Sequence, residues 1–206
     1  MTSDPRIPRA ANDSPALALA GKSELRRHML AARRAIVADT RAQWDGAIGG
    51  HIVAWWRAAQ VEALGVYWPL KDEPELSAAY AELARLGVRL LLPVVKERAA
   101  PLAFAQWRIG EAMVKDTMGV AVPAELRFEA MPPALLVPCL GFNAQGYRLG
   151  YGGGFYDRTL EHAPRPRTVG VAYACLQGDF GSDAHDVALD CIVTERGVIG
   201  GPLAGA

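Results

Sequence analysis

The sequence predicts an α/β protein in three layers, in which a mostly parallel sheet carries helices on both faces. Short apolar runs typical of buried strands alternate along the chain with segments of helical periodicity. The chain has 206 residues, a length that suits a single domain, and 51% of them are hydrophobic, which is enough for a sizeable core. Strand, helix and strand follow one another between residues 61 and 95, an order that indicates a right-handed parallel crossover.

Composition excludes several classes of function. The 22 basic and 22 acidic residues balance, so nothing predicts a nucleic-acid partner. No apolar run reaches the length of a membrane span, and the first residues lack the order of a secretion signal, so we expect no membrane partner. Cys139, Cys175 and Cys191 stand alone in apolar runs, which indicates reduced thiols and a cytoplasmic location. We expect a monomer.

The chain is expected to start with a disordered tail over residues 1–20, followed by one catalytic domain over residues 21–206. Prolines among small and polar residues predict the tail. A first helix is predicted from Lys22 and a second from about Thr40, each with an apolar stripe at helical spacing.

The remaining elements follow from apolar runs and their boundaries. A helix is predicted after Pro74, ending at Gly87. We expect a loop over residues 115–123 and a loose tail over residues 197–206. The strands are predicted over residues 61–68, 88–95, 101–108, 134–140, 168–174 and 189–194.

The stretch from Arg148 to Arg158 contains four glycines within five positions, between a buried strand and a helix predicted from Tyr156. Without side chains, successive backbone N–H groups can turn inward and form an anion-binding nest. The two bracketing arginines suit phosphate oxygens, and Asp157 offers the hard oxygen that Mg²⁺ prefers. The pattern indicates a nucleoside triphosphate with its metal. The alternative is a flexible turn with two solvated arginines, because neither a Walker loop nor a dinucleotide fingerprint is present.

The string Gly146-Tyr-Arg-Leu-Gly-Tyr-Gly-Gly-Gly-Phe-Tyr-Asp157 resembles the signature of the 5-formyltetrahydrofolate cyclo-ligase family. The resemblance implies the family's three-layer fold and its reaction, in which ATP and Mg²⁺ close 5-formyltetrahydrofolate to 5,10-methenyltetrahydrofolate with release of ADP and phosphate. We expect Arg148 and Tyr156 to be catalytic and Asp157 to bind the metal. The ATP-binding residues expected in this stretch are Arg148, Leu149, Gly150, Tyr151, Gly152, Gly153, Gly154, Phe155 and Tyr156.

Two basic residues near the start of the first helix extend the resemblance. Lys22 and Arg26 lie four positions apart and therefore share one helix face. On spacing alone they could form a solvated basic face. Lys22-Ser-Glu-Leu-Arg26 matches the family's Lys-x-x-Leu-Arg pattern, which implies that both side chains bind ATP phosphates.

The folate-binding residues are implied by weaker matches. Residues 67–76 are similar to a family segment whose Glu contacts the pterin of folate, and that Glu maps to Glu73, although Leu76 replaces the usual Thr. Without the resemblance, Glu73 would be an ordinary carboxylate at a helix N-terminus. Leu70, Met118 and Tyr151 complete the expected folate set. Met118 and Val122 depart from the family, which has an aromatic residue and an acid there.

Asn143 stands where the family has Asp, in a turn after the central strand. If that Asp holds metal, Asn143 weakens the site, whereas if it shapes the turn, little changes. Two rival functions stay open. One is a related enzyme acting on another substrate, and the other is a non-catalytic nucleotide- or folate-binding module.

Overall fold

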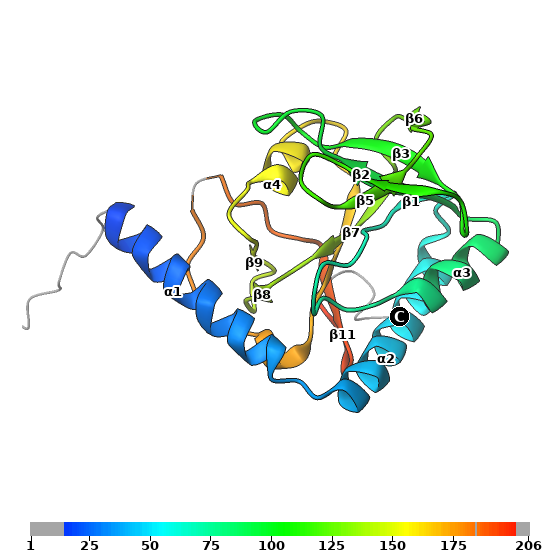
Figure 1. The fold of residues 1–206 in the computed structure, drawn as a ribbon. Helices are drawn as coiled ribbons and strands as arrows, with labels where there is room; N and C mark the ends of the chain where they lie inside the picture. Colours follow the sequence, from blue (N-terminus) through cyan, green and yellow to red (C-terminus); the bar gives the residue numbers. More distant parts are fainter. Residues whose placement is uncertain (1–14, 184, 201–206) are drawn as a thin grey trace, which may run out of the picture.

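The computed structural model describes residues 15–183 and 185–200, and its centre is an eight-stranded sheet (Figure 1). The strand order is β12-β11-β10-β7-β1-β2-β3-β6. The inner strands all pair in parallel, as the strand–helix–strand order predicted. They are β1 (Ala63–Gly65), β2 (Arg89–Val94), β7 (Ala134–Pro138), β10 (Arg167–Val171) and β11 (Cys191–Thr194).

Antiparallel strands close the sheet at both edges. Strand β3 (Ala103–Trp107) pairs with β2, and the short β6 (Phe128–Glu129) pairs with β3. At the other edge, β12 (Gly197–Ile199) turns back along β11. This strand corrects the expectation of a loose tail from residue 197, because its backbone pairs with β11 despite the neighbouring glycines. Residues 201–206 of that expected tail lie outside the described residues.

Helices cover both faces of the sheet, which confirms the predicted three-layer α/β class (Figure 1). Helix α2 (Ala38–Ala59) packs against α3 (Ser77–Arg85) and against the β11 side of the sheet. The short α4 (Phe155–Leu160) lies on the opposite face. Leu64, Leu90 and Leu136 fill the core under α2 and α3, whereas Leu91, Leu135 and Val137 point to the α4 side, as strand alternation requires.

Helix α1 (Pro15–Arg34) starts before Lys22, so the last residues of the expected tail are helical. The rest of that tail lies outside the described residues. Among the helices that the structure describes, none combines the length and apolarity needed to cross a membrane. Met29 anchors α1, because its side chain is buried against Gly141 and Gly178, where any larger residue would collide with it.

Two small hairpins lie outside the main sheet. In the first, β4 (Met113–Lys115) pairs with β5 (Ala121–Pro123), which corrects the loop predicted for residues 115–123. The strands are too short to give a periodic signal. The turn between them is built by Asp116, whose Oδ1 accepts from two backbone N–H groups. The second hairpin pairs β8 (Gly141–Phe142) with β9 (Arg148–Leu149).

The second hairpin places the glycine-rich stretch at the carboxyl end of the central strand β7. Strand β8 follows β7 after Cys139 and Leu140, and β9 runs directly into the glycines. The neighbouring strand β1 ends at the same edge, and the segment after it contains Leu70 and Glu73. In open parallel sheets this edge is where ligands bind. The predicted nucleotide and folate segments therefore emerge side by side.

Candidate active site

The glycine loop, residues 150–154, connects β9 to α4 through an alternating backbone. Gly152 and Gly154 have φ angles of 93° and 65°, whereas Gly153 between them does not have positive φ. Side chains other than glycine rarely adopt such angles, so the sequence requirement lies at Gly152 and Gly154. Alternation between left-handed and right-handed backbone conformations is the pattern of an anion-binding nest.

Two backbone carbonyls of the glycine loop accept hydrogen bonds from arginine side chains, whereas its backbone N–H groups are unpaired in the described part of the chain. Arg26 Nε donates to the carbonyl of Gly150 at 2.9 Å, and Arg158 Nη2 donates to the carbonyl of Gly153 at 2.8 Å. Within the described residues, the N–H groups of the loop have no acceptor. Arginines bind carbonyl groups of the loop, and its N–H groups stay unpaired. Such a loop favours an anion, and phosphate is the anion that such loops bind most readily.

Arg148 and Asp157 stand at the two ends of the loop and form an ion pair, with Nη2 and Oδ1 separated by 2.6 Å. Arg148 Nη1 donates to the carbonyl of Val187. Both ends of this guanidinium are therefore engaged, and its side chain is only 6% exposed. The arrangement suits Arg148 for holding the loop in shape as much as for contacting a phosphate.

Asp157 keeps one carboxylate oxygen free for a metal. Its Oδ2 has no hydrogen-bond partner among the described side chains, and the side chain is 27% exposed. Residues 15–183 and 185–200 contain no cluster of three or more metal-ligating side chains. Asp157 therefore fits a Mg²⁺ that is bound by one carboxylate and completed by substrate phosphates, which is the usual arrangement for this ion.

Tyr156, predicted to be catalytic, packs in α4 beside Arg148. The guanidinium carbon lies 5.9 Å from the centre of its ring. Burial raises the pKa of the Tyr156 phenol, and the negative charge of Glu73 raises it further. The hydroxyl is therefore protonated at physiological pH and can act as a hydrogen-bond donor, not as a base.

The structure brings Arg26 to the glycine loop but holds Lys22 in a different contact. Lys22 Nζ lies 2.6 Å from Asp183 Oδ2 and 2.8 Å from Asp186 Oδ2. Burial lowers the pKa of Lys22, but the hydrogen bonds to both aspartates outweigh it and raise the pKa overall. The sequence gives no signal for the pairing of Lys22 with Asp186, because 164 positions separate the two.

Three of the four predicted folate residues form one hydrogen-bonded group. Tyr151 donates its hydroxyl hydrogen to Glu73 Oε1 at 2.7 Å, and the backbone N–H of Leu70 donates to Glu73 Oε2 at 2.8 Å. Glu73 is buried, with 4% of its surface exposed, while Tyr151 and Leu70 are almost half exposed. A buried carboxylate with an accessible rim can accept N–H donors from a planar heterocycle.

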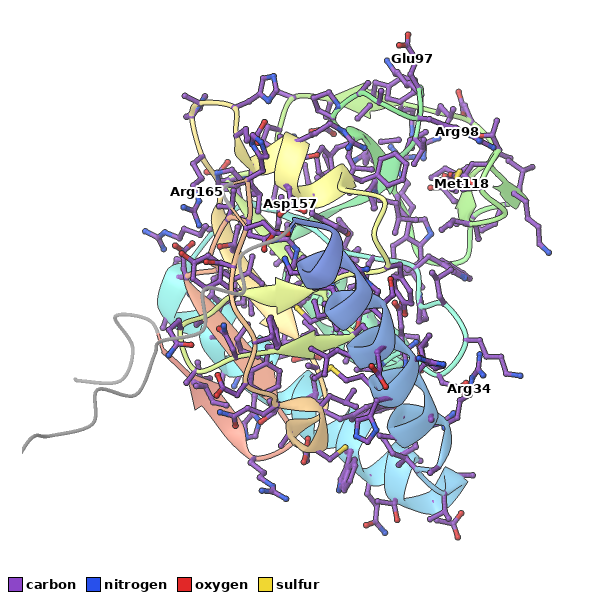
Figure 2. All side chains as sticks on the ribbon, turned by 90° about the vertical axis from the view of Figure 1, so that its left-hand side faces the viewer. Arg34, Glu97, Arg98, Met118, Asp157 and Arg165 are labelled. Carbon is purple, nitrogen blue, oxygen red and sulfur yellow. The ribbon has the colours of Figure 1, made fainter. Side chains whose placement is uncertain are left out.

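Met118, the fourth predicted folate residue, does not join this group. It lies in the turn between β4 and β5, and 47% of its surface is exposed (Figure 2). Val122, where the family has an acid, lies in β5 of the hairpin and is buried with Val94 and Ala105. Its side chain therefore packs the hairpin against the sheet.

Arg33 is a site residue that sequence reasoning missed. Its side chain is almost completely buried, and its Nη2 donates to Tyr151 Oη at 2.6 Å and to the carbonyl of Lys71 at 3.3 Å. Burial raises the pKa of Tyr151, Glu73 raises it further, and Arg33 opposes both. In the sequence Arg33 is one of several arginines in α1, and no local signal separates it from its exposed neighbours.

Asn143 shapes the turn of the β8–β9 hairpin, which is one of the two roles considered for it. Its Oδ1 accepts from the backbone N–H groups of Gln145 and Tyr147, and its Nδ2 donates to the carbonyl of Phe180. The side chain is buried, and its contacts support the turn and join it to the backbone of Phe180, 37 positions away. Replacement of Asp by Asn therefore leaves the turn intact.

Two hollows in the surface lie away from these residues. One, of about 460 Å³, is lined by residues of α2, β10 and β11, including Trp55 and Thr168. The other, of about 600 Å³, lies between α2 and α3. Neither includes a residue predicted for the site.

Comparison with known proteins agrees with this geometry. The sequence model described as the 5-formyltetrahydrofolate cyclo-ligase family matches residues 18–195. A curated relative from Mycolicibacterium smegmatis, named 5-formyltetrahydrofolate cyclo-ligase, is 34% identical over 193 residues, which is 86% of this chain and 96% of the relative. A relative of the same name from Mycoplasma pneumoniae is 28% identical and covers 85% of this chain and 99% of its own.

Solved structures lead to the same family. The 5,10-methenyltetrahydrofolate synthetase of Mycoplasma pneumoniae superposes with a TM-score of 0.72 at 26% identity, covering 84% of this chain and 98% of the other. The synthetase of the same name from Aquifex aeolicus gives a TM-score of 0.75 at 27% identity, with 86% and 91% covered. The family model spans the glycine loop, the Glu73 group and helix α1 from residue 18 onward, and the chain belongs to the 5-formyltetrahydrofolate cyclo-ligase family.

Proposed function

We propose that this chain is an enzyme that uses ATP and Mg²⁺ to cyclise 5-formyltetrahydrofolate to 5,10-methenyltetrahydrofolate, releasing ADP and phosphate. Membership of the cyclo-ligase family supports the reaction class. The substrates are assigned by the two groups of residues at the strand ends. The glycine loop takes the triphosphate, and the group around Glu73 takes the pterin.

The single observation that carries the proposal is the position of Tyr151. Its backbone belongs to the glycine loop, whose N–H groups are free for phosphate, while its hydroxyl bonds to Glu73 at 2.7 Å. One residue thus belongs to both groups. A phosphate cradle and a heterocycle site that share a residue place two substrates within reach of each other, which is what transfer between them requires.

The chemistry follows from the poor leaving ability of an amide-type oxygen. The formyl oxygen of the substrate attacks the γ-phosphorus of ATP, and the bond to ADP breaks. The N10 nitrogen then forms a bond to the activated formyl carbon and loses its proton. Phosphate departs with the former formyl oxygen, which leaves the methenyl bridge. No protein nucleophile is required, so the protein positions the two substrates and stabilises charge.

The chain's own residues supply that positioning. Asp157 would hold Mg²⁺ through its free oxygen, and the ion when bound neutralises phosphate charge. Arg148 fixes Asp157 and the shape of the glycine loop. Tyr156 remains protonated and offers a hydrogen bond to an oxygen that gains charge. Arg26 orients the loop through the carbonyl of Gly150, and Lys22 stands near the same end of α1, paired with aspartates.

The test is the absorbance of the methenyl product on mixing the full chain with 5-formyltetrahydrofolate, ATP and Mg²⁺. We expect product only when all three are present, with one ADP formed for each product molecule. ADP formation with no methenyl product would indicate an enzyme acting on another substrate. Binding of either ligand with no turnover would instead indicate a non-catalytic binding module.

The free thiols of Cys139, Cys175 and Cys191 agree with a cytoplasmic enzyme.

A further inference from the structure

Arg33 is a buried side chain that connects three segments of the candidate site. It belongs to α1, it donates to the carbonyl of Lys71 in the segment after β1, and it donates to the hydroxyl of Tyr151 in the glycine loop. Its guanidinium also lies over the ring of Tyr151, 5.6 Å from the ring centre. Both an edge contact and a face contact therefore fix the orientation of this tyrosine.

Burying this arginine is costly. Only 2% of its surface is exposed, and its Nε and Nη1 have no partner among the described residues. Within residues 15–183 and 185–200 no carboxylate pairs with it directly, and it reaches Glu73 only through the hydroxyl of Tyr151. A buried cation without a direct counter-ion lowers stability, so its presence calls for a role other than stability.

The contact determines the direction of the hydrogen bonds. A guanidinium can only donate, so Tyr151 must accept from Arg33 and must therefore direct its own hydrogen to Glu73. The other oxygen of Glu73 accepts from the N–H of Leu70. The hydrogen bonds therefore run in one direction, from Arg33 to Tyr151 and from Tyr151 to Glu73. Both oxygens of Glu73 are thereby held as acceptors in a fixed orientation.

The backbone beside Glu73 is held in an unfavourable shape by the same region. Asp72, between Lys71 and Glu73, has a φ of 66°, which costs energy for a residue with a side chain. Two arginines hold this turn, because Arg33 binds the carbonyl of Lys71 and Arg41 forms an ion pair with Asp72. The placement of Glu73 is therefore imposed by arginines outside its own segment.

We propose that Arg33 is a positioning residue for the folate site, which acts through Tyr151 and orients Glu73 toward the pterin. This role rests on the proposed function. It predicts that loss of Arg33 weakens use of the folate substrate and leaves use of ATP almost unchanged. Arg34 provides the matched control, since it follows Arg33 in α1 but is exposed and points away from the site (Figure 2).

The experiment compares the wild type with Arg33→Met, Arg33→Lys, Arg34→Met, Tyr151→Phe and the double variant Arg33→Met/Tyr151→Phe. Steady-state kinetics gives KM for each substrate and kcat, and a thermal melt reports folding. Arg33→Met should raise KM for 5-formyltetrahydrofolate on the order of tenfold, the size expected for one hydrogen bond to a charged group. Its KM for ATP should change by less than about twofold. Arg33→Lys should recover part of the loss, and Arg34→Met should match the wild type.

The double variant separates a positioning role from general damage. If Arg33 acts through Tyr151, the two substitutions share one effect, and the double variant is no worse than the poorer single variant. Effects on folate KM that multiply would overturn the role, as would a folded Arg33→Met protein with unchanged kinetics. If Arg33→Met does not fold, Arg33→Lys decides, because an unchanged folate KM in that variant also overturns it. A wild type without turnover refutes the proposed function instead, and the two failures are thereby distinguished.

Discussion

Arg148 and Asp157 form an ion pair that joins the first residue of β9 to the first turn of α4 and so closes the glycine loop at both ends. Nine positions separate the two residues, and the loop between them contains the unpaired N–H groups. The pair fixes the distance that the loop must span, and within that span Gly152 and Gly154 have positive φ angles.

Asp157→Ala should fold and lose turnover. The substitution removes the carboxylate proposed for Mg²⁺ and frees Arg148 from its partner, while the loss of a first-turn acid costs α4 only about 0.3–1 kcal/mol. Turnover is to be measured across a Mg²⁺ titration beside a thermal melt. Glu161→Ala, at the other end of α4, is the control and should behave as wild type. Full Mg²⁺-dependent activity in Asp157→Ala would refute the metal assignment.

Glu73→Gln should impair folate use selectively. Both carboxylate oxygens accept hydrogen bonds, from Tyr151 and from Leu70, so the amide NH₂ of Gln must face one of these donors. We expect folate KM to rise or kcat to fall by about tenfold or more, with ATP KM unchanged. Glu75→Gln tests an exposed acid two positions away and should have no such effect. A selective change in ATP KM would mean that the two substrate sites are exchanged.

Gly152→Val should prevent ATP binding in a folded protein. Valine resists the φ of 93° at this position, and its side chain would approach the guanidinium of Arg26. Gly110→Val is the control, because Gly110 has a φ of 83° in an open turn away from the site. Both variants should lose similar thermal stability, about 1–2 kcal/mol. Calorimetry with ATP and Mg²⁺ should show lost affinity only in Gly152→Val, and equal affinity in both would exclude the phosphate cradle.

Asn143→Ala should lower stability without altering metal dependence. The substitution leaves the N–H groups of Gln145 and Tyr147 and the carbonyl of Phe180 without their partner. Unpaired buried groups predict a loss of about 2–3 kcal/mol in the free energy of unfolding, measurable by urea titration. The Mg²⁺ concentration for half-maximal activity should match the wild type. A shift in that concentration would show that the position contributes to the metal site.

The pairing of Lys22 with Asp186 should make a small, pH-dependent contribution to stability. Burial raises the pKa of Asp186, but the hydrogen bond from Lys22 and that from the backbone N–H of Asp183 lower it by more. A carboxyl whose folded pKa lies below its unfolded value stabilises the protein above that unfolded value, near 4, and the contribution is lost as pH falls through the folded pKa. The pair is partly exposed, so the effect is at most about 1 kcal/mol.

The comparison is between the wild type and Asp186→Asn, by urea titration at pH 7 and at pH 3. The variant should be less stable at pH 7, and the difference should shrink at pH 3, because below its ordinary pKa the carboxyl of the unfolded chain binds a proton and the advantage of the ionised carboxylate in the folded state diminishes. A difference that stays constant over this range would show that the ion pair is not its source.

The sequence by itself determined the inner strands, the helices and the position of the glycine loop. Apolar runs give the inner strands because each must bury both faces, and the alternation with helices makes parallel pairing the natural outcome. The glycines after β7 predict a backbone that side chains cannot follow, and Gly152 and Gly154 have the positive φ angles that bear this out. These are local properties, which depend on residues close together in the chain.

Only the tertiary structure decided which polar side chains meet. Lys22 pairs with aspartates 161 and 164 positions away, and Tyr151 reaches Glu73 across 78 positions. The short strands β4, β5 and β12 form because a partner lies alongside, not because their own residues favour it. Arg33 and Arg34 are adjacent and chemically identical in the sequence. The packing of α1 buries the first against Tyr151 and leaves the second in solvent, because burial is a property of the assembled fold.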